Sequence, residues 1–346
     1  MFAPEGELMK ILTCGKLTLR ILAAGVLLIA VMIACTSIGS ESVSLRKAMQ
    51  GEKNASNIDY EIIMHFRLPR VVLASIVGAS LACAGVVFQA ILRNPLADPY
   101  ILGISSGAGL GSMLAVILGW TWTFGGLSAM MAASFIGAMA TVWLVWGIGR
   151  MTGRLQTTGL LLAGVVVNAF LSAGILFLIS IVKAGHLQTT LFWLMGSFAE
   201  LEYGPVLGAA GGICGFGIIV LMLLGQRLNI LSFGPDEARS MGVPVEQTYF
   251  LAFAAAALMT SAAVSLSGLI GFVGLIVPHA VRLIAGPDHR QLIPLSALTG
   301  AAFLAAADAA ARIAVAPAIL PVGVITALAG GPFFLILLVR CTRSMH

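Results

Sequence analysis

Apolar runs of about twenty residues recur along the whole of this chain, separated by short polar or glycine- and proline-containing stretches. A helix of about twenty residues spans the hydrocarbon core of a bilayer, so each run predicts a transmembrane helix. Charged residues make up only 10% of the 346 residues, whereas soluble domains have about 25%. The sequence therefore predicts an all-α polytopic membrane protein that forms a single transmembrane domain over residues 1–346.

Hydropathy and the punctuating residues together predict about ten spans. Two of them are short enough to be tilted, broken or partly re-entrant. These two are 270–285 and 292–307. The full set is 17–38, 68–91, 99–118, 124–148, 158–181, 204–225, 247–267, 270–285, 292–307 and 320–340.

Glycine is abundant, with forty residues, as expected where helices pack closely in lipid. Gly103, Gly107 and Gly111 follow one another at four-residue spacing and therefore share one face of a helix. Such a series fits either a flexible gate or a smooth ridge for tight helix contact. The ridge is the favoured interpretation.

Lysine and arginine positions predict the orientation of the chain, because basic residues gather in cytoplasmic loops. An N-terminus inside the cell makes 1–16 and 226–246 cytoplasmic, and 39–66 an external loop. Most of the basic residues then lie inside: Lys10, Lys16, Arg20, Arg93, Arg150, Arg154, Arg227, Arg239, Arg282, Arg290, Arg340 and Arg343. Arg67, Arg70 and Arg312 lie outside, against the trend.

The first span has an alternative interpretation as a cleaved signal. Lys10, Lys16 and Arg20 precede an apolar run that ends in Met-Ile-Ala-Cys35, which resembles a poor lipoprotein processing site. A cleaved signal has an apolar core of about 7–15 residues, and this run is longer. We therefore favour a retained membrane span.

Several chemistries are disfavoured by the sequence. It contains no Gly-x-x-x-x-Gly-Lys-Ser/Thr loop, so any energy from ATP has to come from a partner. His279 lacks the second histidine of a zinc-protease helix, and the run 103–107 lacks the order of a membrane serine protease. The five cysteines are scattered singly, which is typical of small apolar packing residues. We expect no catalytic residue, metal or cofactor.

The loop 226–246 predicts a short helix outside the bilayer. Pro235 suits a first helical position, and Asp236 and Glu237 oppose the positive end of the helix dipole. Arg239 complements the other end, and Gly242 suits a left-handed cap. Two turns of helix are marginal in water. This helix is therefore expected to dock, either on its own protein or in a groove of a partner.

Several long motifs in the same order resemble the FecCD-type permeases, over roughly residues 17–340. These permeases are the membrane subunits of ABC importers for iron-siderophores, haem and vitamin B12. The motifs are Arg-Leu-Pro-Arg at 67–70, the run 94–109, Phe-Trp-Leu-Met-Gly-Ser-Phe at 192–198, and the segments 228–243, 267–279, 288–290 and 320–330.

The resemblance implies a type II ABC importer permease fold with ten spans in a bacterial or archaeal inner membrane. It also implies three kinds of partner: a second permease subunit in a homodimer, two cytoplasmic ATPase subunits and an external substrate-binding protein. Hydropathy alone indicates none of this stoichiometry. The chain itself would be a transport subunit that imports a metal chelate by alternating access. Both of its termini would lie in the cytoplasm.

The resemblance also assigns roles to residues. The ATPase-coupling helix maps to Pro235, Asp236, Glu237, Ala238, Arg239, Met241 and Gly242. Arg67, Arg70 and Arg312 would meet acidic residues of the binding protein. For Arg312 the alternative is an ion pair with Asp308 on the same helix face, which leaves both interpretations open.

One position departs from the family pattern. Relatives commonly carry glutamate before the last span, where this chain has Ile319, so any acidic contact made there is absent. An ion-coupled secondary transporter is the alternative function, and it needs carboxylates at mid-membrane. Asp98, Asp288 and Asp308 are predicted at span ends or in loops, which disfavours it. The expected cargo is a ferric siderophore, with cobalamin or haem as alternatives.

Overall fold

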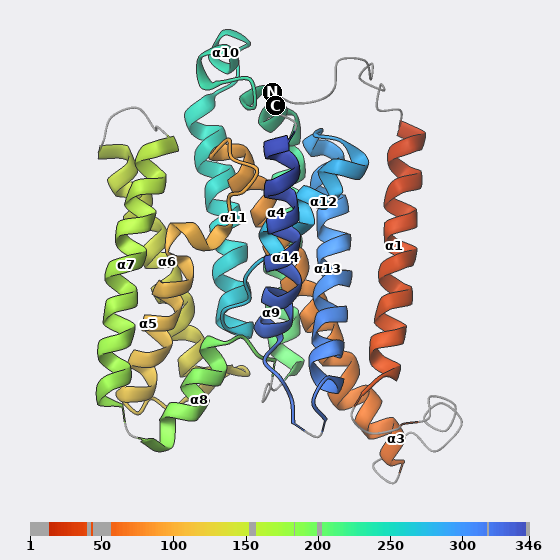
Figure 1. The fold of residues 1–346 in the computed structure, drawn as a ribbon, viewed down its shortest axis with the longest axis vertical. Coiled ribbons are helices and arrows are strands. Elements are labelled where there is room, and N and C mark those ends of the chain that lie inside the picture. The colour runs from red at the N-terminus through yellow and green to blue at the C-terminus, as the bar shows by residue number, and fades with distance from the viewer. Residues whose placement is uncertain are drawn as a thin grey trace.

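The computed structural model describes residues 14–39, 43, 57–151, 157–182, 184–198, 203–316 and 318–343. These form a helical bundle with one two-residue antiparallel hairpin, β1 (Thr123–Phe124) and β2 (Leu127–Ser128) (Figure 1). The helices before the hairpin are α1 (Cys14–Ser37), α3 (Ile58–Glu61), the π-helix η1 (Ile62–Arg67), α4 (Leu68–Ile91), the 3-10 helix η2 (Pro99–Leu102) and α5 (Ile104–Ile117). Those after it are α6 (Ala129–Met151), α7 (Thr157–Ile181), α8 (Ala184–Leu194), α9 (Tyr203–Leu231), α10 (Pro235–Ser240), α11 (Val245–Ser267), α12 (Val273–Ala285), α13 (His289–Ile313) and α14 (Val322–Arg343).

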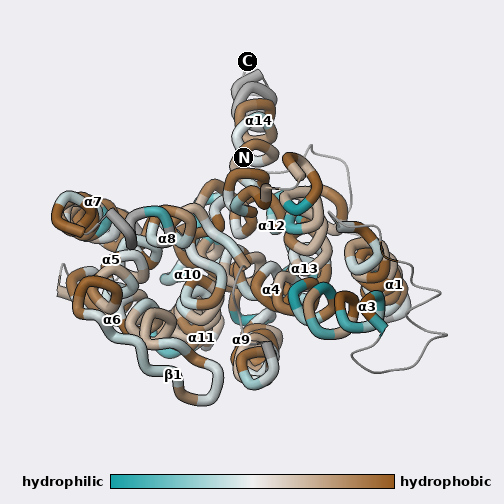
Figure 2. The backbone as a smooth tube through the Cα atoms, turned by 90° about the horizontal axis from the view of Figure 1, so that it is seen from below, coloured by the Kyte–Doolittle hydropathy of each residue, from teal (hydrophilic) through white to brown (hydrophobic). Residues whose placement is uncertain are grey.

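Seven of the described helices are long and apolar enough to cross a membrane, and three shorter apolar helices accompany them. The shorter three are α5, α12 and the described apolar part of α14. Each predicted span therefore corresponds to a helix, and the prediction of an all-α polytopic protein is confirmed. Apolar segments also cover the outer helices of the bundle (Figure 2).

The bundle has two ends, which we name after their short helices (Figure 1). The α10 end holds α10, the start of α1 and the turn between α12 and α13. The α3 end holds α3, α8, the end of α1 and the end of α13. The site residues predicted from the sequence divide between these two ends.

Helix α4 forms the centre of the bundle and packs against α13, α11 and α9. A side chain placed at Gly78 would collide with the backbone of Gly300, and one at Gly85 with the backbone of Gly274. These glycines let α4 approach α13 and α12 backbone to backbone, which gives van der Waals contact where lipid offers no hydrophobic driving force.

The glycine series at the start of α5 forms a packing ridge. Side chains at Gly107 and Gly111 would collide with α6, at Thr141 and Ala133. Gly103 has a different task, because its φ of 77° places it in the left-handed region between η2 and α5. The close contact with α6 agrees with the ridge and gives no indication of a gate.

The second span begins earlier than predicted. Helix starts at Ile58 and runs through η1 into α4, so Arg67 and Arg70 lie within one continuous helix and not at its mouth. Pro69 lacks an N–H, and the N–H of Leu68 reaches back five residues to the carbonyl of Ile63. The π-helical turn keeps the helix continuous ahead of the proline.

The two spans predicted to be short behave differently. α12 has only 13 residues and follows the non-helical stretch 268–272, whose polar groups are bound by protein: the N–H of Ile270 donates to the Tyr100 hydroxyl oxygen at 3.1 Å. The span predicted at 292–307 exists, but it is neither short nor broken nor re-entrant, because α13 is an unbroken helix of 25 residues. α8 was not predicted at all.

Candidate functional site

Helix α10 has the local structure that its sequence predicts. Pro235 occupies the first turn, Gly242 has a φ of 78°, and Arg239 lies in the last turn. Arg239 pairs with Asp236 at 2.8 Å and with Glu246 of α11 at 2.6 Å. The Glu246 hydrogen bond and the charges of both carboxylates raise the pKa of the exposed Arg239 guanidinium above its ordinary value. These pairs tie α10 to the start of α11.

The faces of α10 differ in exposure. Ala238 is 0% exposed and packs into the protein, so its side chain forms no part of a surface that a partner can touch. Met241 is 64% exposed and Phe233 is 71% exposed, at either end of the helix. Asp236 and Glu237 are also exposed. α10 therefore rests on its own protein and still presents two large apolar side chains outward, which combines both alternatives left open by the sequence.

At the α3 end, Asp308 of α13 is fully buried and pairs with two arginines. Arg70 of α4 donates from Nη2 to Oδ1 at 2.8 Å and from Nε to both carboxylate oxygens at 3.1 Å. Arg312 places Nε 3.3 Å from Oδ2, one helical turn along α13. This ion pair was weighed from the sequence, but as an exposed one. Asp308 instead joins α4 to α13 from inside the protein.

The end of α1 is held by two arginines. Arg312 donates to the carbonyls of Cys35 at 2.9 Å and Ile38 at 3.2 Å. Arg67 donates to the carbonyl of Ser37 at 3.2 Å. The last carbonyls of a helix have no partner within the helix and carry its negative dipole, so guanidinium groups suit them. We name Arg67, Arg70, Asp308 and Arg312 the arginine cluster.

Burial of the arginine cluster differs from the exposed docking rim expected from the sequence. Arg67 is 7% exposed and Arg312 is 6% exposed. Arg70 is nearly as buried and faces Asp308. The covering segment is the end of α1, which lies far away in the sequence and carries no charged residue in its last turn. No local sequence pattern predicts this contact.

A second polar network, at the α10 end, was recognised only as a family motif. Asp288 caps α13 by accepting from the N–H of Arg290, and it also binds the Arg290 guanidinium and Asn229 of α9. Burial raises the pKa of Asp288, but the hydrogen bonds from Arg290 and Asn229 outweigh it and lower the pKa to about 2. The depressed pKa means that its contribution to stability is present above the ordinary value of 3.8 and is lost as the pH falls through about 2.

Arg20 of α1 completes this network. Its Nη1 donates to the Ala285 carbonyl at 3.0 Å and to Gln291 at 2.7 Å. α1 is thus tied to α12 and α13 at one end and to α4 and α13 at the other. Ile319 is 44% exposed beside the α3 end.

Comparison with known proteins decides the family. The model of the FecCD transport family matches residues 27–340. The chain belongs to the FecCD transport family. A cobalamin import system permease protein, BtuC, of Halobacterium salinarum is 40% identical and covers 91% of this chain and 94% of its own length. A hemin transport system permease protein, HmuU, of Yersinia pestis is 38% identical and covers 94% and 97%.

The fold agrees with this FecCD assignment. A solved metal-chelate type ABC transporter in an inward-facing conformation matches with a TM-score of 0.82 and 31% identity, and it covers 93% of this chain and 99% of its own. The FecCD chain is thus a multi-pass permease, the transport subunit of an ABC importer. The ion-coupled alternative is set aside, since the family assignment gives an ABC importer permease and the buried Asp308 is paired with two arginines.

Proposed function

We propose that this FecCD permease imports a metal chelate, most readily a ferric siderophore, in a bacterial or archaeal inner membrane. The observation that carries the proposal is the full-length likeness, in sequence and fold, to permeases named for cobalamin, hemin and metal chelates. Those relatives carry different chelates at similar identity. Calorimetry on the cognate binding protein with ferric siderophores, haem and cobalamin would identify the cargo. If the binding protein bound only a ligand that contains no metal, the proposal would be contradicted.

We further propose that α10 transmits the motion of a cytoplasmic ATPase dimer. The exposed Phe233 and Met241 are apolar anchors of the kind that bind pockets in a partner. The pairs of Arg239 with Asp236 and Glu246 stiffen the link to α11, so that a shift of α10 moves the span behind it. ATP binding in the partner would then change the populations of outward-open and inward-open states.

We also propose that the positive charge of the arginine cluster attracts an external binding protein. Three arginines and one aspartate carry a formal charge of 3 − 1 = +2. A field of this sign speeds the approach of an acidic surface even where the guanidinium groups are engaged with the protein itself. Direct contact on docking would be made by the neighbouring exposed residues of η1, while Arg70 stays paired with Asp308.

Salt dependence tests this steering. Replacing Arg67 with glutamine removes one charge and leaves both pairs to Asp308 in place. We expect the association rate of the binding protein to fall by a factor of about 2 to 10 at an ionic strength of about 0.1 M. At about 1 M the Debye length is about 3 Å, and the difference should vanish. Arg227→Gln, an exposed change at the α10 end, is the control. Equal association rates at low salt for the natural protein, Arg67→Gln and Arg227→Gln would exclude electrostatic steering by the arginine cluster.

Orientation is the basis of both assignments. At the α10 end lie Arg20, Arg150, Arg227, Arg239, Arg282 and Arg290, which supports a cytoplasmic location for that end. A cysteine in place of His65, exposed in η1, should react with an impermeant thiol reagent added to intact cells, and one in place of Ser240 should not. The natural Cys35, Cys83 and Cys214 are buried. If Ser240→Cys were labelled and His65→Cys were not, the α10 end would be external and the proposed topology would be wrong.

The same orientation places the predicted N-terminal segment 1–16 inside and the loop 39–66 outside; 1–13, 40–42 and 44–56 of these lie outside the described residues. We also propose a second copy of the permease as partner. The described part of α14 packs mainly on α12 and α13 and keeps Leu328 and Leu335 exposed, and α7 exposes Phe170. These apolar faces are available to a second subunit or to membrane lipid.

A further inference from the structure

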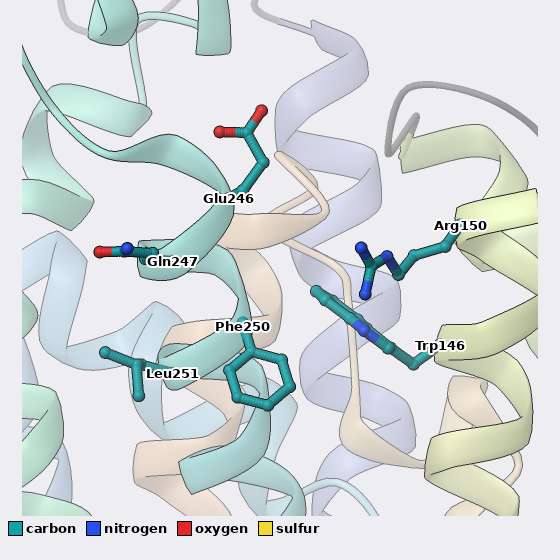
Figure 3. A pocket seen from close by; sticks show the side chains of 6 residues that line it. All are labelled: Trp146, Arg150, Glu246, Gln247, Phe250 and Leu251. Atoms are coloured by element: carbon teal, nitrogen blue, oxygen red, sulfur yellow. The ribbon is translucent and has the colours of Figure 1, made fainter.

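A pocket of about 370 Å³ opens between the last turn of α6 and the first turns of α11, at the α10 end (Figure 3). Of its lining residues, only Glu246 has a role above, through its pair with Arg239. Its size is in the range of small-molecule sites, about 300–1,000 Å³. The lining residues are Trp146, Arg150, Glu246, Gln247, Phe250 and Leu251.

One wall of the pocket is aromatic and apolar. The Trp146 ring lies 4.5 Å from the Phe253 ring and 6.1 Å from Phe250, and Trp143 lies 5.7 Å from Phe250 between ring centroids. Trp146 is buried, whereas Trp143, Phe250 and Leu251 keep about two fifths of their surface exposed. A tryptophan exposed near the end of a span, such as Trp143, is typical of contact with lipid at the membrane interface.

The mouth of the pocket carries one charge of each sign. Figure 3 shows the Arg150 guanidinium on the α6 side and the Glu246 carboxylate on the α11 side. Among the residues that the structure describes, Arg150 has no ion-pair partner. Oε1 of Glu246 accepts a hydrogen bond from the Arg239 guanidinium of α10 at 2.6 Å, and the Glu246 side chain is 68% exposed. Gln247 also lines the pocket, and Figure 3 shows its amide pointing away from Arg150.

We propose that this pocket binds a zwitterionic aminophospholipid of the phosphatidylethanolamine class, from the leaflet on the α10 side. Arg150 would donate to the lipid phosphate, and the lipid ammonium would donate to Glu246. An acyl chain would lie on Phe250 and Leu251. The formal charge of the lining, 1 − 1 = 0, suits a headgroup with both charges.

The depth of the charged and apolar residues fits this orientation. Phe250 lies one helical turn beyond Glu246 on α11, a rise of about 6 Å. The polar layer of a bilayer leaflet is about 5–7 Å thick, so the charges fall among headgroups and the rings at the start of the hydrocarbon. A choline headgroup has no N–H for Glu246, and an anionic glycerol headgroup offers that carboxylate no cation.

The site adjoins α10, because Glu246 is shared between the lipid ammonium and Arg239. Bound lipid would fill the space between the end of α6 and the start of α11, next to the exposed helix α10. The inference stands apart from the identity of the cargo, since it concerns only the permease and the bilayer.

Native mass spectrometry of the complete transporter, purified from nanodiscs with equal amounts of phosphatidylethanolamine, phosphatidylcholine and phosphatidylglycerol, tests the proposal. We expect phosphatidylethanolamine to be retained preferentially. Arg150→Gln and Glu246→Gln should each lower its retention about tenfold, which corresponds to about 1.4 kcal/mol for a lost charge-assisted hydrogen bond. Arg150→Lys should keep most of it. The control Arg227→Gln removes an exposed arginine at the same end that does not line the pocket.

Three results would overturn the proposal. Equal retention by Arg150→Gln and Arg227→Gln would show that the lipid binds elsewhere. Preferential retention of phosphatidylglycerol would assign the pocket to an anionic ligand. Absence of lipid from the complex with the ATPase would assign the pocket to the contact surface with that partner. Phe250→Ala, which removes the ring without changing charge, should shorten retention of the acyl chain while the headgroup preference persists.

Discussion

Replacing Asp308 with alanine is expected to destabilise the folded permease by about 3–5 kcal/mol. The change leaves Arg70 and Arg312 buried beside each other without the carboxylate that both contact. Desolvated charges without a counter-ion are far more costly than a lost surface pair. The thermal unfolding midpoint in detergent and the yield of monodisperse protein measure the effect, and both should fall sharply.

A second substitution separates charge from packing. Leucine at both Asp308 and Arg70 removes the carboxylate together with its bidentate partner, and Arg312 keeps the carbonyls of Cys35 and Ile38. This variant should recover more than half of the lost stability, because apolar side chains of similar volume replace a buried pair at little net cost. Asp59→Asn, at the same end, should behave like the natural protein. An Asp308→Ala protein of normal stability would refute the buried cluster.

Exchanging Met241 for aspartate should abolish ATP-driven uptake while the permease folds normally. The side chain is exposed, so the folded state loses little, generally within about 0.5 kcal/mol. An anchor in a partner pocket is worth about 2 kcal/mol or more, and its loss weakens binding by a factor of about 30. Phe233→Asp should act in the same way. Co-purification of the ATPase and uptake by proteoliposomes are the measurements.

Met241→Leu is the matched control, because it keeps the apolar volume. Ala238→Asp, at first sight an equivalent change, does not test docking: Ala238 is fully buried, so a charge there would disrupt the packing of α10 on its own protein. Normal ATPase co-purification and uptake by Met241→Asp would show that α10 does not bind the partner through this side chain.

Local patterns in the sequence predicted most of the helices. Twenty-residue apolar runs predicted each span, and the order Pro235, acids, Arg239, Gly242 predicted α10, since capping and dipole effects act within one or two turns. α8 was missed because it is only 11 residues long, shorter than a span. The continuation of helix through η1 was missed because a proline normally marks a helix start.

The site residues depend on contacts between distant segments. The exceptional position of Arg67, Arg70 and Arg312 was visible in the sequence, but their burial comes from carbonyls at the end of α1. Every residue has a backbone carbonyl, so the sequence does not indicate which carbonyls accept hydrogen bonds from these arginines. The exposure of Met241 against the burial of Ala238 likewise follows from how α10 lies on α9 and α11. The pocket at Trp146 joins two helices that no motif connects.

Uptake of a metal chelate by proteoliposomes is the most direct test of the proposed function. The permease would be reconstituted with its ATPase and supplied with the loaded binding protein. The account predicts accumulation of labelled chelate inside that requires ATP and the binding protein, proceeds without any ion gradient, and is lost with Met241→Asp. Accumulation driven by a proton or sodium gradient in the absence of ATP would contradict it.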